Sequence, residues 1–153
     1  MANTYTQIHI HVIFAVQNRQ SLIHKKWRAD LFKYISGIIT NHEHKALQIN
    51  GVADHIHLLI GFRPTQSLSE LVKYVKQDSS KWVNQNKYIN GRFSWQKGYA
   101  AFSHSASQVS QVIRYIQNQE MHHKKESFRE EYLDFLDKYE VDFDERYIFK
   151  PVS

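Results

Sequence analysis

The sequence predicts an α+β fold in which helices pack on a sheet of short strands. Short segments alternate apolar and polar residues, as strands with one buried face do, and longer segments carry apolar residues at helical spacing. These segments follow one another in the order βαββαβ, and two further helical segments come after them. No linker, repeat or low-complexity run interrupts this order, so we expect residues 1–153 to form a single domain.

The first half of the chain supplies three strands and one helix. Residues 5–16 alternate with period two, and one face of this strand carries Ile8, Ile10, Val12 and Phe14. Residues 25–42 have helical spacing of their apolar residues, which are Trp27, Leu31, Tyr34, Ile35, Ile38 and Ile39. Segments 47–49 and 55–62 are the next two predicted strands, and Asn50-Gly51 between them is typical of a hairpin turn.

Two capping patterns mark helices in the second half. Ser67 with Glu70 matches a capping box and predicts a helix start, followed by the apolar residues Leu68, Leu71, Val72 and Val75. Ser105 with Gln108 matches a second box and predicts a helix that continues to about residue 124. A last helix is indicated by an apolar stripe of Phe128, Tyr132, Phe135, Leu136 and Tyr139.

The predicted sheet has two unlike faces. Residues 98–103 would be its fourth strand, and the order matches a ferredoxin-like sandwich, in which the first and third strands lie together at the centre. Helices should cover the apolar face of these two strands. We expect the opposite face to be open and to carry four histidines: His9, His11, His55 and His57.

Composition excludes several classes of site. The chain has no cysteine, so disulfides, thiolate nucleophiles and cysteine metal sites are excluded. We expect a cytoplasmic protein without a membrane span or secretory signal. The net charge of +5 is uneven, since residues 1–97 carry +8 and residues 98–153 carry −3. A basic body is compatible with a polyanion partner such as nucleic acid, and equally with a solvated surface.

His55 and His57 are the strongest candidate for a metal site. On a strand their side chains point to the same face, and two adjacent imidazoles can begin a metal site. The same spacing occurs at His9/His11 and at His42/His44, where composition alone gives roughly 0.6 such pairs. We expect His42/His44 at the surface, because residues two apart on a helix do not face each other. The spacing alone therefore does not establish a metal site.

The helix predicted after Ser105 offers partners for the two histidines. Tyr115 and Gln119 are four residues apart, hence neighbours at the polar edge of the helix. The amide oxygen of Gln119 could be a third metal ligand, and Tyr115 beside it could be a nucleophile. Alternatively, Tyr115 is an ordinary packing residue, and the chain has nine tyrosines among which spacing cannot choose.

These motifs together resemble a known family. Asp54-His55-Ile56-His57-Leu58-Leu59 is similar to the histidine–hydrophobic–histidine motif of HUH single-strand DNA endonucleases. Tyr115-Ile116-Gln117-Asn118-Gln119, followed by His122-His123, resembles the tyrosine helix of Y1 transposases of the IS200/IS605 type. Phe14 to Arg19 and Trp95 to Ser103 also resemble this family, so the similarity covers essentially the whole chain.

The resemblance implies a reaction, a cofactor and an assembly. His55, His57 and Gln119 would hold one divalent ion, Mg²⁺ or Mn²⁺, and Tyr115 would attack single-stranded DNA at hairpin ends to form a 5′-phosphotyrosine link. Family members are homodimers whose sheets join edge to edge. The tyrosine helix of one subunit can complete the histidine site of the other in trans.

The DNA contacts and the alternatives are less defined by the sequence. Candidate DNA-binding residues are Arg19, His11, Lys25 and Arg63, and each basic one could instead be a solvated surface charge. Position 17 is Gln where the family pattern suggests a basic residue. Two other functions remain open: a non-catalytic single-strand nucleic-acid-binding module, and a domesticated enzyme that nicks repeat hairpins.

Overall fold

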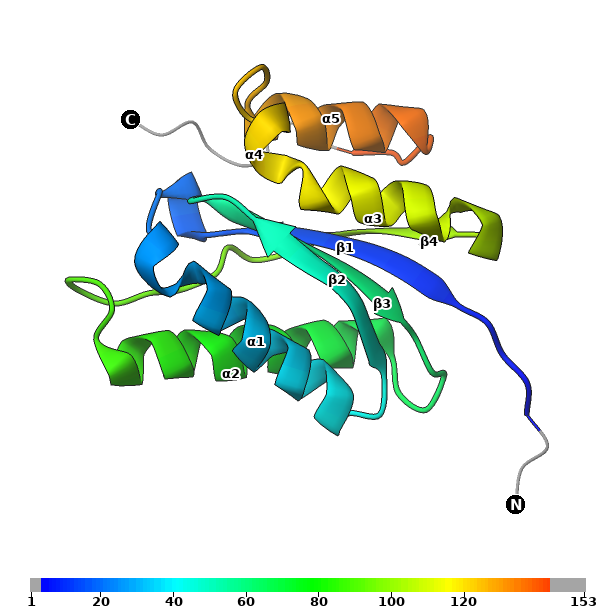
Figure 1. Ribbon diagram of the computed structural model, residues 1–153, viewed down its shortest axis with the longest axis horizontal. Coiled ribbons are helices and arrows are strands. Elements are labelled where there is room, and N and C mark those ends of the chain that lie inside the picture. Colours follow the sequence, from blue (N-terminus) through cyan, green and yellow to red (C-terminus); the bar gives the residue numbers. More distant parts are fainter. Residues whose placement is uncertain (1–3, 144–153) are drawn as a thin grey trace.

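The computed structural model describes residues 4–143 and contains one antiparallel sheet between two layers of helices (Figure 1). The strands are β1 (His9–Ala15), β2 (Lys45–Gly51), β3 (His55–Gly61) and β4 (Ala100–His104). The helices are α1 (Lys25–Asn41), α2 (Leu68–Asn86), α3 (Val109–Gln117), α4 (Gln119–His122) and α5 (Phe128–Lys138), with short 3-10 turns at Gln17–Arg19 and Ala106–Gln108.

The sheet confirms the predicted ferredoxin-like arrangement. Its strand order is β2-β3-β1-β4, so β1 and β3 occupy the centre, and each neighbouring pair is antiparallel. In the β1–β3 register Ala15 lies opposite His55, and Ile13 lies opposite His57. The histidine pair of β3 is therefore at the centre of the sheet, near the end of β1.

Helices α1 and α2 cover the face of the sheet that we call the apolar face. Figure 1 shows both helices on the same side, below the strands. The strand side chains that point to them are fully buried: Val12, Phe14, Ile56, Leu58 and Ile60. The same cluster includes residues of both helices, among them Leu31, Ile35, Leu71 and Val75. This face was predicted correctly, because strict alternation assigns alternate strand residues to one side.

The opposite face, which we call the histidine face, is covered, and the prediction of an open face was wrong. Helices α3, α4 and α5 lie across it (Figure 1). This face carries apolar residues as well as histidines, and burying them is favourable. Ile13 and Ala15 pack with α5, and Leu59 packs with α3. His11, His55 and His57 are consequently at most 1% exposed.

The β2–β3 hairpin is present, but its turn is not at Asn50-Gly51. Both residues belong to β2, and the connection runs over residues 52–54. Gly51 is required for close approach, since a Cβ there would lie 2.4 Å from the backbone oxygen of His55. The glycine that resembled a turn signal therefore allows two strands to meet closely beside the first histidine.

The helix predicted from Ser105 to about Lys124 is interrupted at Asn118. The capping box is confirmed, with the Ser105 N–H donating to Gln108 Oε1 at 3.2 Å. At the other end, the side chain of Asn50 donates from Nδ2 to the carbonyls of Ile116 (2.9 Å) and Gln117 (3.1 Å). These bonds from β2 satisfy carbonyls that a continuing helix would bond, so α3 ends and α4 begins after Asn118.

The remaining helices and strands are present as predicted, although the first strand is shorter, His9–Ala15 instead of residues 5–16. Ser67 Oγ accepts from the Glu70 N–H at 3.1 Å and begins α2, as its pattern predicted. The prediction that His44 lies at the surface was wrong, because it is 3% exposed. Its ring stacks on Phe62, and its Nε2 lies 2.7 Å from Gln66 Oε1.

Candidate active site

His55 and His57 lie side by side on β3, beneath the helices of the histidine face. Both side chains are fully buried, and their ring centroids are 5.2 Å apart. The Nε2 atoms of both rings point to a common partner, since they lie 3.3 Å and 3.0 Å from the same carboxylate oxygen of Glu131. The strand thus places two imidazole nitrogens at one point inside the protein.

Asp54 orients the first of these rings. Its Oδ1 lies 2.7 Å from His55 Nδ1, which fits a proton on Nδ1 and leaves Nε2 as the ligand atom. Burial alone would lower the pKa of His55, but the hydrogen bonds with Asp54 and Glu131 outweigh it and raise that pKa. A carboxylate behind a histidine is the usual support of a metal-binding imidazole.

His11 of β1 supports the second ring. Its Nε2 lies 2.8 Å from His57 Nδ1, and the two ring centroids are 5.0 Å apart. Burial lowers the pKa of His57 to about 4, although its bond with Glu131 acts in the opposite direction. Burial also lowers the pKa of His11 well below its usual value. Both rings are therefore neutral near pH 7, the state in which imidazole binds a metal.

Tyr115 of α3 reaches the same cluster within its own chain. Its ring lies 5.9 Å from that of His57 and stacks on His122 at 4.4 Å. Its hydroxyl donates to Glu131 Oε2 in a short hydrogen bond. The pKa of Tyr115 is raised, mainly by burial and further by the negative charge of Glu131. The resting hydroxyl is therefore protonated and needs a nearby positive charge to become a good nucleophile.

Gln119 is where the spacing predicted it to be, although the helix breaks just before it. Its side chain is fully buried, and its Oε1 lies 3.2 Å from His55 Nε2. The structure thus brings together the four residues that the sequence singled out, namely His55, His57, Tyr115 and Gln119. The break at Asn118 does not separate Gln119 from Tyr115, because both contact Glu131.

Sequence reasoning missed two members of this cluster, Glu131 and His123. Glu131 is 1% exposed and lies on α5, and His123, just after α4, places its Nε2 3.1 Å from Glu131 Oε1. A signal was present, because position 131 falls on the buried stripe between Phe128 and Phe135. A carboxylate on the apolar side of an amphipathic helix needs buried partners, so it marks a site.

The donor atoms fit a divalent ion. One ligand atom from each of His55, His57, His123 and Glu131 lies within 4.8 Å of all the others. Gln119 adds an amide oxygen beside His55. Imidazole nitrogens with carboxylate or amide oxygens are ligands that Mn²⁺, Co²⁺ and Zn²⁺ accept readily, and oxygen-preferring Mg²⁺ accepts less readily.

The predicted DNA-binding residues lie on separate parts of the fold. Arg19 follows β1 at the end of the sheet where the Val16 N–H bonds the Asp54 carbonyl. Lys25 is exposed and lies 3.9 Å from Glu120 of α4, and Arg63 is exposed after β3. His11 is 1% exposed, and its Nε2 lies 2.8 Å from His57 Nδ1, so in this structure it supports His57, and its contact with DNA stays a prediction.

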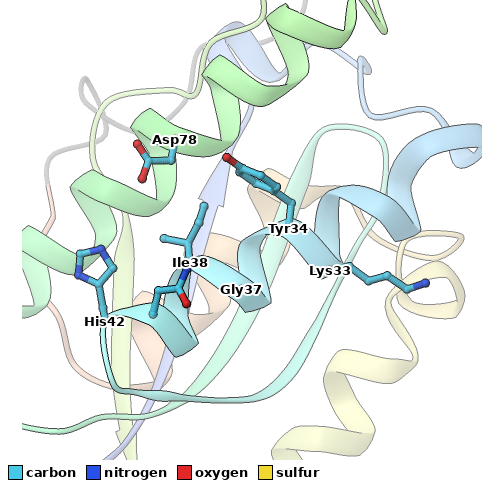
Figure 2. Close-up of a pocket in the computed structure, with 7 residues that line it drawn as sticks. Lys33, Tyr34, Gly37, Ile38, His42 and Asp78 are labelled. Carbon is cyan, nitrogen blue, oxygen red and sulfur yellow. The ribbon is translucent and has the colours of Figure 1, made fainter.

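Two hollows in the surface differ in their relation to the cluster. One of about 240 Å³ adjoins Tyr115 and is also lined by His11, His104, Phe135 and Lys138. The other, of about 360 Å³, lies between α1 and α2 on the far side of the sheet (Figure 2). In Figure 2, Lys33 points away from Asp78 and His42, so the charged side chains that line this second hollow do not converge on one point. Of these two hollows, the first is the one that reaches Tyr115.

Comparisons with known proteins agree with the fold and the motifs. The family model described as "Transposase IS200 like" matches residues 4–119. The ISDra2 transposase TnpA of Deinococcus radiodurans is 23% identical over 125 residues, covering 78% of this chain and 87% of that protein. The transposase of insertion sequence IS200 from Salmonella typhimurium is 27% identical over 105 residues, covering 65% of this chain and 68% of that protein.

Solved structures share the architecture. A REP-associated tyrosine transposase bound to a REP hairpin has a TM-score of 0.60 and 12% identity, covering 80% of this chain and 73% of that chain. A transposase candidate of Deinococcus radiodurans R1 has a TM-score of 0.59 and 21% identity, covering 78% and 95%. Among residues 4–143, no helix is both long and apolar enough to cross a membrane. Because the family match spans most of its length, the chain belongs to the IS200-like transposase family, whose activity is DNA transposition.

Proposed function

We propose that this transposase cuts and rejoins single-stranded DNA through a covalent link to Tyr115, with one divalent ion held by His55, His57 and Gln119. One observation carries the proposal: the Tyr115 hydroxyl, both imidazole Nε2 atoms and the Gln119 amide all converge on the carboxylate of Glu131. A nucleophile and three potential ligands of an ion therefore share one buried point.

The reaction assigned to Tyr115 is a phosphoryl transfer. Its hydroxyl oxygen attacks the scissile phosphorus, the bond from phosphorus to the 3′ oxygen breaks, and the 3′ oxygen leaves as a hydroxyl after taking up a proton. The DNA end stays joined to the protein as a 5′-phosphotyrosine. This link keeps the energy of the phosphodiester, so a 3′-hydroxyl of another strand can reverse the step without ATP.

The histidines and Gln119 serve the phosphate rather than the tyrosine. His55, held by Asp54, and His57, held by His11, present their Nε2 atoms from a rigid strand. When bound there, Mg²⁺ or Mn²⁺ would polarise the scissile phosphate and neutralise its developing charge. The protein supplies the orientation, because both rings are fixed by a second hydrogen bond and full burial.

The substrate proposed is single-stranded DNA that carries hairpins. The chain has a net charge of +5, and its predicted contacts Arg19, Lys25 and Arg63 lie at the end of β1, at the start of α1 and just after β3. A fold neighbour was solved bound to a REP hairpin, which makes a hairpin a suitable first probe. We expect this reaction in the prokaryotic cytoplasm, where the DNA is, with residues 1–153 acting as one domain.

The predicted homodimer with a tyrosine helix acting in trans stays a prediction. In the structure Tyr115 meets the histidines of its own chain, which supports cleavage in cis in this conformation. Mixing a Tyr115→Phe protein with a His55→Ala/His57→Ala protein separates the two arrangements. Restored cleavage in the mixture would support sites shared between subunits, whereas two inactive proteins that stay inactive together would support cis.

A covalent-adduct assay tests the proposed function. Hairpin-bearing single-stranded DNA and Mn²⁺ should give a protein–DNA band that survives denaturation, and Tyr115→Phe should give none. Tyr34→Phe is the matched control. Tyr34 of α1 stacks on Trp82 of α2, on the other side of the sheet from Tyr115, so this variant should form the adduct as wild type does. An adduct that persists in Tyr115→Phe would refute the nucleophile. DNA binding without any adduct, unaffected by chelator, would indicate a non-catalytic binding module.

A further inference from the structure

Helix α5 delivers a carboxylate to the centre of the histidine cluster. Glu131 is 1% exposed, and its Oε1 lies 3.0 Å from His57 Nε2, 3.3 Å from His55 Nε2 and 3.1 Å from His123 Nε2. The family match covers residues 4–119, so α5 and Glu131 lie outside it. The ligand set expected from the family motif, two histidines and a glutamine, therefore does not include this carboxylate.

The separations around Glu131 Oε1 are those of ligands that share an ion. With metal–ligand bonds of about 2.0–2.1 Å, neighbouring ligand atoms are separated by about 2.9–3.4 Å in octahedral or tetrahedral geometry. The three distances from Oε1 to imidazole nitrogens fall in that range. Since all four ligand atoms lie within 4.8 Å of one another, one ion could be placed among them.

Charge also indicates an ion in this place. Burying a carboxylate is costly unless positive charge compensates it, and Glu131 is 1% exposed. A divalent cation among these imidazoles would supply that compensation. It would also lie near the Tyr115 hydroxyl, which bonds the same carboxylate.

The second oxygen of Glu131 faces the nucleophile. Oε2 accepts the hydrogen bond of the Tyr115 hydroxyl and lies 3.4 Å from Gln119 Nε2. One carboxylate therefore reaches the cluster of ligand atoms with one oxygen and the attacking hydroxyl with the other. A ligand placed in this way fixes the distance from the ion to the nucleophile.

We propose that Glu131 is a ligand of the divalent ion through Oε1, while its Oε2 positions the Tyr115 hydroxyl beside that ion. This inference rests on the proposed function, since it adds a ligand to the site assigned there. It makes α5 part of the active site, and it leaves His123 near enough to contribute a further nitrogen. A set rich in imidazole and charged by one carboxylate should bind Mn²⁺ more tightly than Mg²⁺.

Calorimetric titration of the chelator-treated full chain with Mn²⁺ alone tests the proposal without any enzyme assay. Glu131→Gln keeps the side-chain shape and removes the charge, and we expect at least about tenfold weaker Mn²⁺ binding. Asp134→Asn is the matched control, because Asp134 is exposed on the same helix, and it should bind as wild type does. Unchanged affinity in Glu131→Gln would overturn the proposal. Tighter binding would also overturn it, and would show that Glu131 blocks the ion.

A measurement on the unmodified protein keeps the proposal testable if Glu131→Gln fails to fold. In a crystal grown with Mn²⁺, the anomalous peak should lie within about 2.3 Å of Glu131 Oε1 and of at least two imidazole nitrogens. A peak held by the histidines but out of reach of Glu131 would overturn it. The His55→Ala/His57→Ala variant distinguishes failure of the Glu131 proposal from failure of the proposed metal site. If this variant keeps its affinity for Mn²⁺, the metal site itself is refuted.

Discussion

The two faces of one sheet differ in what they bury. Of the described residues, those buried on the apolar face are mainly hydrophobic, from Val12 and Phe14 to Trp95, and the hydroxyl of Ser79 accepts from Trp95 Nε1 among them. The histidine face instead buries His11, His55 and His57 from the strands, with Gln119 and Glu131 from the helices. Adjacent residues of β3 thus serve opposite purposes, since Ile56 points to one face while His55 and His57 point to the other.

The difference shows how a small domain can bury a reactive site. Within the cluster around Glu131, the reactive groups have partners: Asp54 for His55, His11 for His57, and Glu131 for Tyr115. None of these residues is among those with unpaired buried side-chain atoms in residues 4–143. The apolar face should therefore supply most of the free energy of folding, and the histidine face the chemistry.

Phe14→Ala should give the largest change in stability. Phe14 is fully buried and packs edge-to-face on Trp95 at 4.9 Å, so its truncation should lower the free energy of unfolding by about 3–5 kcal/mol. Tyr115→Phe removes one hydroxyl on the other face, and its cost should be about 1 kcal/mol. Urea unfolding of both variants measures the contrast. Equal losses from the two faces would break the proposed division between stability and chemistry.

Acid should weaken the histidine face selectively. Because burial lowers the pKa of His57 to about 4, the unfolded chain binds a proton between pH 6.5 and 4 that the native protein does not. Stability therefore falls as the pH falls through this window, by roughly 3 kcal/mol from this group. Glu131, whose pKa is lowered by hydrogen bonds with His123, His55 and His57 that outweigh its burial, acts in the same direction at lower pH. His55, with its raised pKa, opposes the trend.

Urea unfolding at pH 7 and pH 4.5, with chelator present, measures this loss. His57→Gln should flatten the pH dependence, because the group that resists protonation is gone. His24→Gln is the matched control, since His24 is exposed at the start of α1. A wild-type slope in His57→Gln would show that another group causes the acid sensitivity.

Local patterns predicted those parts of the molecule that depend on neighbours in the chain. Alternation placed His55 and His57 on one face, and spacing by four joined Tyr115 to Gln119. Glu131 was missed because its contact with His57 spans 74 residues and depends on how α5 crosses the sheet. The open face was a wrong prediction for the same reason, since no local pattern states which surface the last helices will cover.

Asn50 has a different role from the one that its sequence pattern suggested. Asn-Gly pairs favour turns, yet here Asn50 is a strand residue whose side chain bonds the carbonyls of Ile116 and Gln117. These bonds lie where α3 ends at Gln117, two residues before Gln119, which contacts the histidines. A strand of the sheet thus sets where the tyrosine helix stops, and with it the positions of Tyr115 and Gln119.

Asn50→Ala should give the smallest effect, and one confined to the histidine face. Loss of two partly exposed hydrogen bonds should lower the free energy of unfolding by about 1 kcal/mol. A shift of the helix end should also slow adduct formation, by about fivefold if a similar energy is lost in the transition state. Asn86→Ala is the matched control, because Asn86 donates to the Trp82 carbonyl of α2 on the other side of the sheet. It should cost similar stability while leaving the adduct rate unchanged, and equal slowing in both variants would mean that helix ends matter only for folding.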